Sequence, residues 1–373
     1  MIGGARRAGR WLIPVTAAFV AAGLLPLPAA AVVLSGEPAG YQFYHSYAEV
    51  KSAIDHTVAG HPDIAERFAL SDYAAPGDTG KSYEGREIWG IKITGNIAAD
   101  HNRPAIFVNA LIHADERASE ELALYVMRQL TNNYGRNTRL GRRVTNIVDT
   151  RVIYIVPMMN PDGAEYDFSG GVFHRWRKNR QPIPGSSAIG IDLNRQFGYT
   201  WNCCGGSSGN PFSKYYRGPS AWFAPEAVAY RDFVDALANE GRPLSEILSL
   251  HSAGRLVLWP YVYTREKVPP DMTVDDHRTF VALGREMAAR NGYHPEQASH
   301  LYIVDGDQDD WAYGTHGIFA LTIELPRGRP KRYYPTQAQI RRFDRRNRGA
   351  VLYFFKQADC PYRAAGLAAG HCS

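Results

Sequence analysis

Two histidines and one glutamate have the residue types and the spacing of a metal site. His113 and Glu116 are three residues apart and follow the apolar run 105–111. His251 directly follows a second apolar run, 247–250. Imidazole and carboxylate groups both bind Zn²⁺, and three protein ligands leave the fourth position open for water or substrate. The three residues therefore predict one zinc ion in a catalytic arrangement.

The elements that must position these residues are strands alternating with helices. Short apolar runs predict strands, and apolar residues spaced three or four apart predict helices. Such alternation favours a mixed or mainly parallel sheet covered on both faces, whose strand carboxyl ends border a ligand crevice. The expected strands are 88–93, 105–111, 152–156, 247–251 and 318–325, and the expected helices are 44–59, 116–130, 225–238, 274–291 and 336–357.

A long segment, 157–222, has no persistent period and is rich in Gly, Ser, Pro and Asn. So long an irregular segment in a compact domain is usually functional. It contains Arg177, whose guanidinium could stabilise an oxyanion, and the pair Asn194 and Arg195, which could bind a carboxylate. Taken alone, Arg177 has the ordinary alternative of a surface arginine.

Acidic residues lie in and just before the last predicted strand. Glu324 interrupts an apolar run, where a carboxylate costs free energy unless it faces a polar crevice or belongs to a buried ion pair. Tyr302 and four aspartates are expected in the preceding loop, namely Asp305, Asp307, Asp309 and Asp310. These acids could bind calcium, remain solvated, or receive a cationic side chain.

The N-terminus has the pattern of a secretory signal in residues 1–31. Three arginines begin it, an apolar centre spans 11–25, and three alanines at 29–31 form the expected cleavage site. The apolar part is short for a membrane anchor, and its paired arginines suggest twin-arginine export. Removal of the signal lowers the formal charge from +5 by three arginines to +2, so no general affinity for nucleic acid is expected. The predicted last helix carries five arginines beside an apolar stripe, which favours a solvated basic face.

The mature chain, 32–373, is expected to form one large domain because no linker or repeat divides it. The expected segments are a short N-terminal segment at 32–43, a catalytic domain at 44–358 and a tail at 359–373. Four cysteines in a secreted chain predict two disulfides. Cys360 with Cys372 would close the tail, whereas the adjacent Cys203 and Cys204 either form a vicinal bridge or have separate partners.

The order of several short motifs resembles the zinc metallocarboxypeptidases of the carboxypeptidase A/B type, and secreted microbial members in particular. The resemblance extends over about 44–357, and its motifs are specific only in combination. They are His113-x-x-Glu116, Asn160-Pro-Asp-Gly163, Trp176-Arg177-Lys178, Asp192-x-Asn194-Arg195, Tyr216-Arg-Gly-Pro219 with Pro225-Glu226, His251-Ser252, Tyr302 before Asp310-Trp311, and Thr322-x-Glu324-Leu325.

The resemblance implies a mixed, largely parallel eight-stranded sheet between helices, in a monomer that removes the last residue of peptides and proteins. It also implies a role for each matched residue. His113, Glu116 and His251 would bind one zinc ion, Asp192 would orient a ligand histidine, Glu324 would act as general base and acid, Arg177 would polarise the scissile carbonyl, Asn194 and Arg195 would hold the terminal carboxylate, and Tyr302 would close over it.

Specificity follows from the residue immediately before Asp310-Trp311. Members that prefer Lys or Arg carry an acid there, and here it is Asp309, with Asp307 as a second acid nearby. We therefore expect a preference for C-terminal Lys or Arg, with mixed specificity as the alternative because an exposed charge attracts a cation only modestly. The chain departs from the family at Asp115, where members usually carry an arginine that binds the upstream substrate backbone.

Three other functions fit parts of the sequence. Gly205-Gly-Ser207-Ser-Gly209 matches the Gly-x-Ser-x-Gly motif of serine hydrolases, but no strand is expected before it and no helix after it. A zinc-containing peptide-binding protein without catalysis would not need Glu324 and Arg177. A peptidoglycan peptidase of the same fold would be expected to alter the carboxylate-binding pair, which is intact here.

Overall fold

The structure is a computed structural model that describes residues 1–4, 38, 40–98, 100, 103–328 and 333–372. The chain divides into the units Met1–Ser35 and Gly36–Ser373, and the fold described here is that of the second unit. The expected signal peptide lies, beyond its first four residues, outside the described residues. Within the described ranges, no helix has the length and apolar character needed to cross a bilayer.

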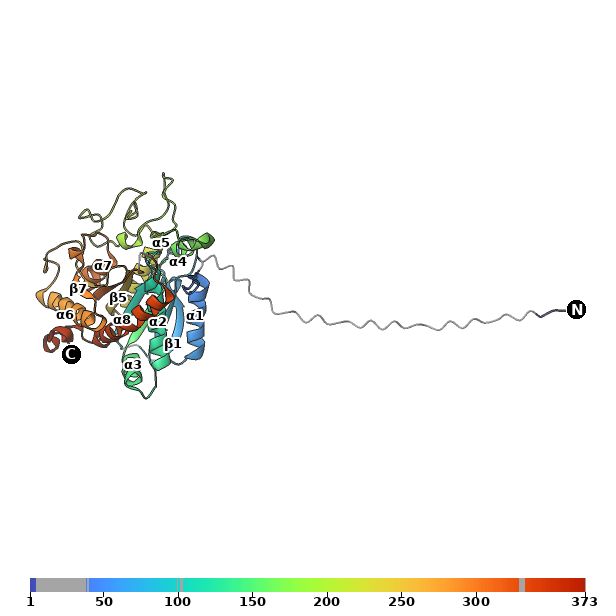
Figure 1. Ribbon diagram of the computed structural model, residues 1–373, viewed down its shortest axis with the longest axis horizontal. Coiled ribbons are helices and arrows are strands. Elements are labelled where there is room, and N and C mark those ends of the chain that lie inside the picture. The colour runs from blue at the N-terminus through green and yellow to red at the C-terminus, as the bar shows by residue number, and fades with distance from the viewer. Residues whose placement is uncertain (5–37, 39, 99, 101–102, 329–332, 373) are drawn as a thin grey trace. The chain divides into compact units, whose positions relative to one another are not determined.

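An eight-stranded mixed sheet has the strand order β1-β2-β4-β3-β5-β8-β6-β7. Helices lie around it in this unit (Figure 1). The pairs β3/β4, β3/β5, β5/β8 and β6/β7 are parallel, and the other three are antiparallel. The strands are β1 (Ala65–Ala69), β2 (Trp89–Ile93), β3 (Ala105–Ala110), β4 (Val152–Val156), β5 (Leu244–Ser252), β6 (Leu256–Trp259), β7 (His294–Gln297) and β8 (Phe319–Leu325). This confirms the predicted mixed, largely parallel sheet.

Helices cover both faces of the sheet because the central strands are apolar on both sides. In β3, Ile106 and Val108 belong to one core, whereas Phe107 belongs to the other. The first core includes residues of α1, α2, α3, α6 and α8, and the second includes residues of α5 and α7. The helices are α1 (Tyr47–Gly60), α2 (Arg117–Asn133), α3 (Arg139–Thr150), α4 (Pro161–Asp167), α5 (Pro225–Asn239), α6 (Val274–Asn291), α7 (Gln308–His316), α8 (Gln337–Gln357) and α9 (Ala368–His371).

Several elements were not predicted, mostly because their sequences are polar or short. Strand β7 reads His-Pro-Glu-Gln, without an apolar run, and pairs with β6. The prediction that Asp309 and Asp310 lie in a loop is wrong, because they form the first turn of α7. Asp307 caps that turn by accepting the backbone N–H groups of both residues. The region expected to be irregular also contains α4, which Asn160 caps.

Both disulfides are present, and the vicinal alternative holds for the adjacent pair. Cys203 is bonded to Cys204, and Cys360 to Cys372. The second bridge closes the C-terminal tail, as expected.

The aromatic contact between β3 and α5 gives a test of the packing. Phe107 is fully buried, and its ring lies 5.0 Å from that of Phe233. We predict that Phe107→Ala lowers the free energy of unfolding by about 3–5 kcal/mol in urea titrations, because it leaves a cavity. Phe212→Ala is the matched control, since that side chain is 71% exposed and its loss should change stability by less than about 0.5 kcal/mol. Equal effects of the two variants would contradict this packing.

Candidate active site

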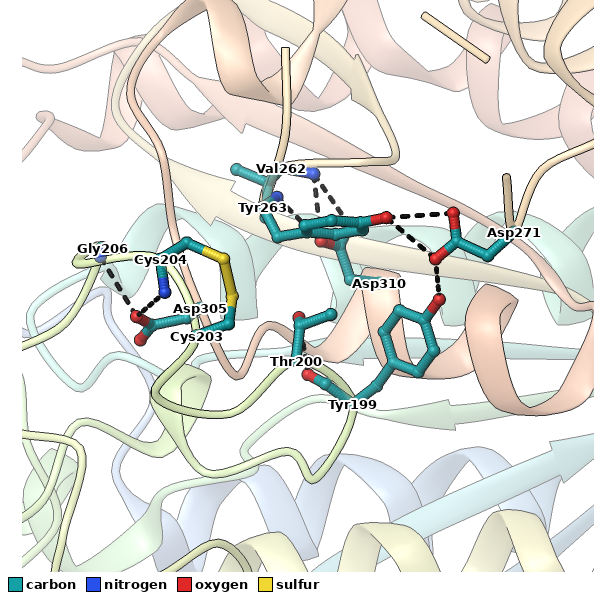
Figure 2. The surroundings of a disulfide bond; sticks show 10 residues. All are labelled: Tyr199, Thr200, Cys203, Cys204, Gly206, Val262, Tyr263, Asp271, Asp305 and Asp310. Atoms are coloured by element: carbon teal, nitrogen blue, oxygen red, sulfur yellow. Dashed lines mark hydrogen bonds between the residues drawn. A yellow bond between two sulfur atoms is a disulfide. The ribbon is translucent and has the colours of Figure 1, made fainter. Parts of the chain in front are cut away.

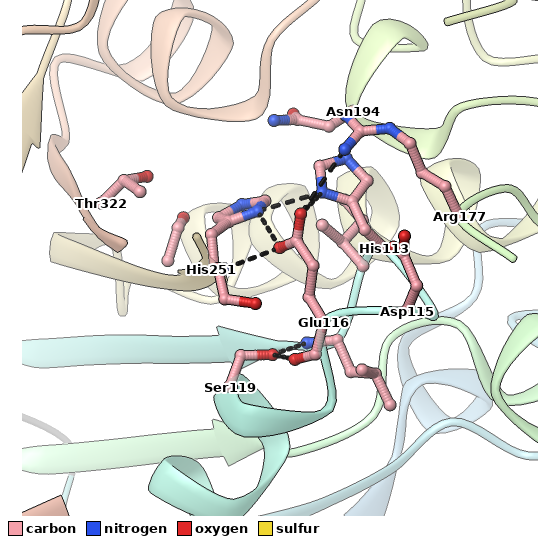
Figure 3. Close-up of polar contacts among 12 residues, drawn as sticks. His113, Asp115, Glu116, Ser119, Arg177, Asn194, His251 and Thr322 are labelled. Atoms are coloured by element: carbon pink, nitrogen blue, oxygen red, sulfur yellow. Dashed lines mark hydrogen bonds and ion pairs between the residues drawn. The ribbon is translucent and has the colours of Figure 1, made fainter. Parts of the chain in front are cut away.

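The carboxyl end of β3 and the start of α2 place His113 and Glu116 together. The hydroxyl of Ser119 accepts the backbone N–H of Leu111 at 3.1 Å and donates to the carbonyl of Glu116 at 2.7 Å (Figure 3). This pair of bonds fixes the turn between the strand and the helix. His251 lies near the end of β5, the parallel neighbour of β3. The two strand ends therefore meet at one edge of the sheet.

The three predicted ligands converge in the structure. The carboxylate of Glu116 lies 3.0 Å from Nδ1 of His113 and 3.0 Å from Nδ1 of His251. The two Nδ1 atoms are 3.1 Å apart, and all three side chains are buried. Two imidazole nitrogens and a carboxylate facing one point form a donor set that suits Zn²⁺.

Polar contacts on the outer ring nitrogens leave both Nδ1 atoms available to a metal ion. Nε2 of His113 lies 3.2 Å from Oδ1 of Asp192. Nε2 of His251 lies 3.0 Å from the side-chain amide of Gln308, whose Oε1 is buried without a hydrogen-bond partner. Turning this amide end for end would bring Oε1 to the ring and give His251 an acceptor for its Nε2–H. Each ring then directs its Nδ1 lone pair at the shared point.

A second group of possible ligands does not leave its donor atoms available to a metal ion. It consists of His45, Glu120 and Glu121. Nδ1 of His45 lies 2.8 Å from Glu121, and Arg117 donates to Glu120 at 3.0 Å. These side chains are paired with one another and with a buried arginine. Among the described residues, the group around Glu116 is therefore the better zinc site.

Glu324 and Arg177 flank the three ligands. The parallel register of β5 and β8 pairs His251 with Glu324, which is partly buried and has one oxygen without a hydrogen-bond partner. Burial and the nearby charge of Glu116 raise the pKa of Glu324 to about 7. Burial alone would lower the pKa of Arg177, but Asp192, which accepts its Nε–H at 2.9 Å, raises that pKa. Arg177 therefore stays charged beside the ligands.

The ligands open into a cavity of about 890 Å³ that also holds the predicted carboxylate-binding residues. Arg195 is only 2% exposed and forms no ion pair among the residues described here. A buried, unpaired guanidinium is suited to an anionic ligand. The amide of Asn194 also lines the cavity, although its Nδ2 donates to Asp307 at 2.8 Å. Tyr302 lies at the rim and is 48% exposed.

Asp309 lies in the same cavity, at its junction with α7 and β8. Its carboxylate accepts hydrogen bonds from the hydroxyl groups of Ser249 and Thr322, each at 2.7 Å. Asp307 accepts backbone N–H groups of α7 and so holds the start of that helix. The carboxylate of Asp309 therefore faces the cavity, whereas that of Asp307 mainly caps α7.

The carboxylates of Asp305 and Asp310, on either side of Asp309 in the sequence, accept hydrogen bonds from different backbone N–H groups. Figure 2 shows Asp305 accepting the backbone N–H groups of Cys204 and Gly206, beside the vicinal disulfide. Asp310 accepts those of Val262 and Tyr263. The disulfide loop is thereby fastened to the segment that leads into α7.

Sequence reasoning missed Gln308 and Ser249 as members of the site, and also Tyr333, which lines the cavity and donates its hydroxyl to Asp115. Gln308 directly precedes Asp309, but its contact with His251 depends on how α7 packs. Ser249 precedes His251 by two residues, and this spacing on one strand was a usable signal. Ser207, from the serine hydrolase motif, lies among turns and bends with neither a strand before it nor a helix after it.

Comparisons with known proteins agree with this geometry. The model of the peptidase M14 family, described as zinc carboxypeptidase, matches residues 54–350. A zinc carboxypeptidase from Saccharothrix mutabilis subsp. capreolus is 36% identical over 331 residues, which cover 88% of this chain and 73% of that protein. Human carboxypeptidase B is 29% identical over 289 residues, which cover 76% of this chain and 63%, less than two thirds, of that protein.

Solved structures share the fold of this chain. Thrombin activatable fibrinolysis inhibitor superposes with a TM-score of 0.72 at 26% identity, over 84% of this chain and 74% of that chain. Carboxypeptidase A from Helicoverpa armigera shares the fold, with a TM-score of 0.69 at 24% identity, over 87% of this chain and 74% of that chain. The chain therefore belongs to the zinc carboxypeptidase family.

Proposed function

We propose that this chain is a secreted zinc carboxypeptidase that hydrolyses the C-terminal peptide bond of peptides and proteins and prefers Lys or Arg as the residue released. The observation that carries the proposal is the shared cavity. It places the ligands around Glu116 with a buried, unpaired arginine, Arg195, and a buried acid, Asp309. These groups match the charges of a terminal carboxylate and a basic side chain.

In this proposal His113, Glu116 and His251 hold one zinc ion. When bound, zinc acts as a Lewis acid that lowers the pKa of water and polarises a carbonyl oxygen. Asp192, and Gln308 with its amide oxygen turned toward the ring, would keep the two imidazoles in the required tautomers through Nε2. Calcium is not part of the proposal, because each aspartate near α7 already has its own donors.

Glu324 is proposed to move the proton. Its raised pKa suits a carboxylate that takes a proton from the attacking water and then gives one to the leaving nitrogen. Arg177, held by Asp192, would donate to the oxygen that becomes negative as water adds to the carbonyl carbon. Both groups line the cavity beside the ligands, so neither needs a large rearrangement to act.

The substrate's free carboxylate is proposed to bind Arg195 and the remaining amide N–H of Asn194. Tyr302, half exposed at the rim, is the side chain best placed to cover the bound residue. Asp309 would receive the ammonium or guanidinium of a C-terminal Lys or Arg. The alternative is mixed specificity, in which apolar residues are also released at lower rates, because Ser249 and Thr322 already satisfy part of the Asp309 carboxylate.

Secretion is proposed from the signal pattern at 1–31 and agrees with two disulfides, which persist in oxidising compartments. The mature protein would be a monomer with one catalytic domain at 44–358. The tail at 359–373 would be closed by the Cys360–Cys372 bridge.

The first prediction concerns the reaction. Hydrolysis of blocked dipeptides should release Arg well above Phe, and a zinc chelator should abolish both reactions. Glu324→Gln should lower kcat by about 10²- to 10⁴-fold, because it removes the proton acceptor, while its zinc content stays at the native level. Zinc binding without hydrolysis would instead favour a peptide-binding protein, and hydrolysis of neither peptide by the native enzyme would overturn the proposal.

The second prediction concerns the pH dependence of specificity. Burial and the charge of Asp307 raise the pKa of Asp309 to about 7, so the pocket is neutral below that pH and anionic above it. The ratio of kcat/KM for Arg to that for Phe should therefore rise between about pH 6 and about pH 8. Ionisations that change kcat/KM equally for both substrates cancel in this ratio.

Asp309→Asn is the matched control for that profile. It should remove the pH dependence of the ratio and lower it at least about 30-fold at high pH, because a buried charge pair loses one partner. A ratio that is flat with pH in the native enzyme, or unchanged in the variant, would show that Asp309 does not select the side chain.

The third prediction concerns the support of the ligands. Asp192→Asn should raise the Kd for zinc by about 10- to 100-fold in a competition titration, because His113 loses its anionic partner. Asp162→Asn is the control, since Asp162 is equally buried but bonds to Ser82 and Arg86. Zinc affinity that is the same in both variants would contradict the assigned role of Asp192.

A further inference from the structure

Asp115 lies on the opposite side of the predicted zinc ligands from the Asp309 pocket. Figure 3 shows Thr322, whose hydroxyl bonds to Asp309, on one side of His251 and His113, with Asp115 on the other. Both acids line the same cavity. A peptide whose last side chain entered the Asp309 pocket would pass the predicted ligands and approach Asp115 with its upstream residues.

The carboxylate of Asp115 is buried and only half satisfied. Its side chain is 9% exposed, and Oδ2 accepts the hydroxyl of Tyr333 at 2.5 Å. Oδ1 is buried and has no hydrogen-bond partner among the described residues. A buried acceptor left in this way is costly, so a donor supplied by a ligand would be favourable.

Three of the five arginines that line the cavity contact groups other than Asp115. Arg177 donates to Asp192 and Glu116, whereas Arg175 and Arg327 lie over the ring of Tyr333, at 5.2 and 5.6 Å from its centre. None of the three forms an ion pair with Asp115 in the parts of the chain that the structure describes. Among the described residues, Oδ1 of Asp115 thus lacks a cationic partner, and Asp115 lines the cavity that a substrate would enter.

We propose that Asp115 forms an upstream subsite that binds an ammonium group of the substrate. The group is either the α-ammonium of a short peptide or the side chain of a basic residue upstream of the cleaved bond. A charge-assisted hydrogen bond to Oδ1 would complete the carboxylate, whose Oδ2 already has Tyr333. The inference rests on the proposed carboxypeptidase function and adds a second requirement to its substrate, beyond the residue released.

Two pairs of substrates test the subsite and distinguish the two sources of the ammonium group. Ala-Ala-Arg and its N-acetyl form differ in the α-amine, and acetyl-Lys-Ala-Arg and acetyl-Gln-Ala-Arg differ in a side chain. The measurement is kcat/KM for release of Arg. The native enzyme should prefer the cationic member of at least one pair by about tenfold or more. Absence of both preferences would overturn the subsite, and this comparison needs no variant.

Asp115→Asn should remove the preference by lowering kcat/KM for the cationic substrate, while acetyl-Ala-Ala-Arg is still cleaved and the zinc content is unchanged. Tyr333→Phe is the matched control, because it removes a neighbouring hydroxyl and keeps the carboxylate, so the preference should remain. A preference that survives in Asp115→Asn would overturn the assignment. If the proposed carboxypeptidase function itself is wrong, the native enzyme will release no Arg from acetyl-Ala-Ala-Arg. This outcome is therefore distinguishable from failure of the subsite alone.

Discussion

The contact on which the site depends is that of two imidazole Nδ1 atoms, 3.1 Å apart, with a single buried carboxylate, that of Glu116. A cation bound by both lone pairs and by the carboxylate would stabilise this arrangement. Each ring must therefore give its other nitrogen a fixed partner, and Asp192 and Gln308 occupy those positions. The position of Arg177 depends on the same carboxylate, because Asp192 contacts His113 and also accepts a hydrogen bond from Arg177.

The fold meets this constraint with few elements. Parallel pairing of β3 with β5 brings two ligand-bearing strand ends together, and pairing of β5 with β8 places Glu324 beside His251. The start of α7 provides a partner for His251 in Gln308 and the pocket acid in the next residue, Asp309. A shift of α7 would therefore affect metal binding and specificity together. The vicinal disulfide loop, bonded to Asp305, helps to fix the approach to that helix (Figure 2).

The parts of the fold that sequence predicted are those encoded locally. The apolar runs of β3, β4 and β8 and the apolar stripe of α6 predicted these elements to within about a residue, and the strand ends predicted where the ligands meet. Strand β7 and helix α7 were missed because their residues are mainly polar and tertiary contacts position them. The same limit applies to Gln308 and to the hydroxyl partners of Asp309, whose roles depend on packing between distant segments. Sequence also could not decide between a vicinal bridge and separate partners for Cys203 and Cys204.

The most direct test of the account is the zinc content of the purified protein and of two single variants. We predict one equivalent of zinc in the native protein and in His45→Ala, and a loss of that zinc in His251→Ala. His45 belongs to the paired group beside Arg117, so its variant controls for binding elsewhere. A full equivalent of zinc retained in His251→Ala, or lost in His45→Ala, would contradict the central claim that His113, Glu116 and His251 form the metal site.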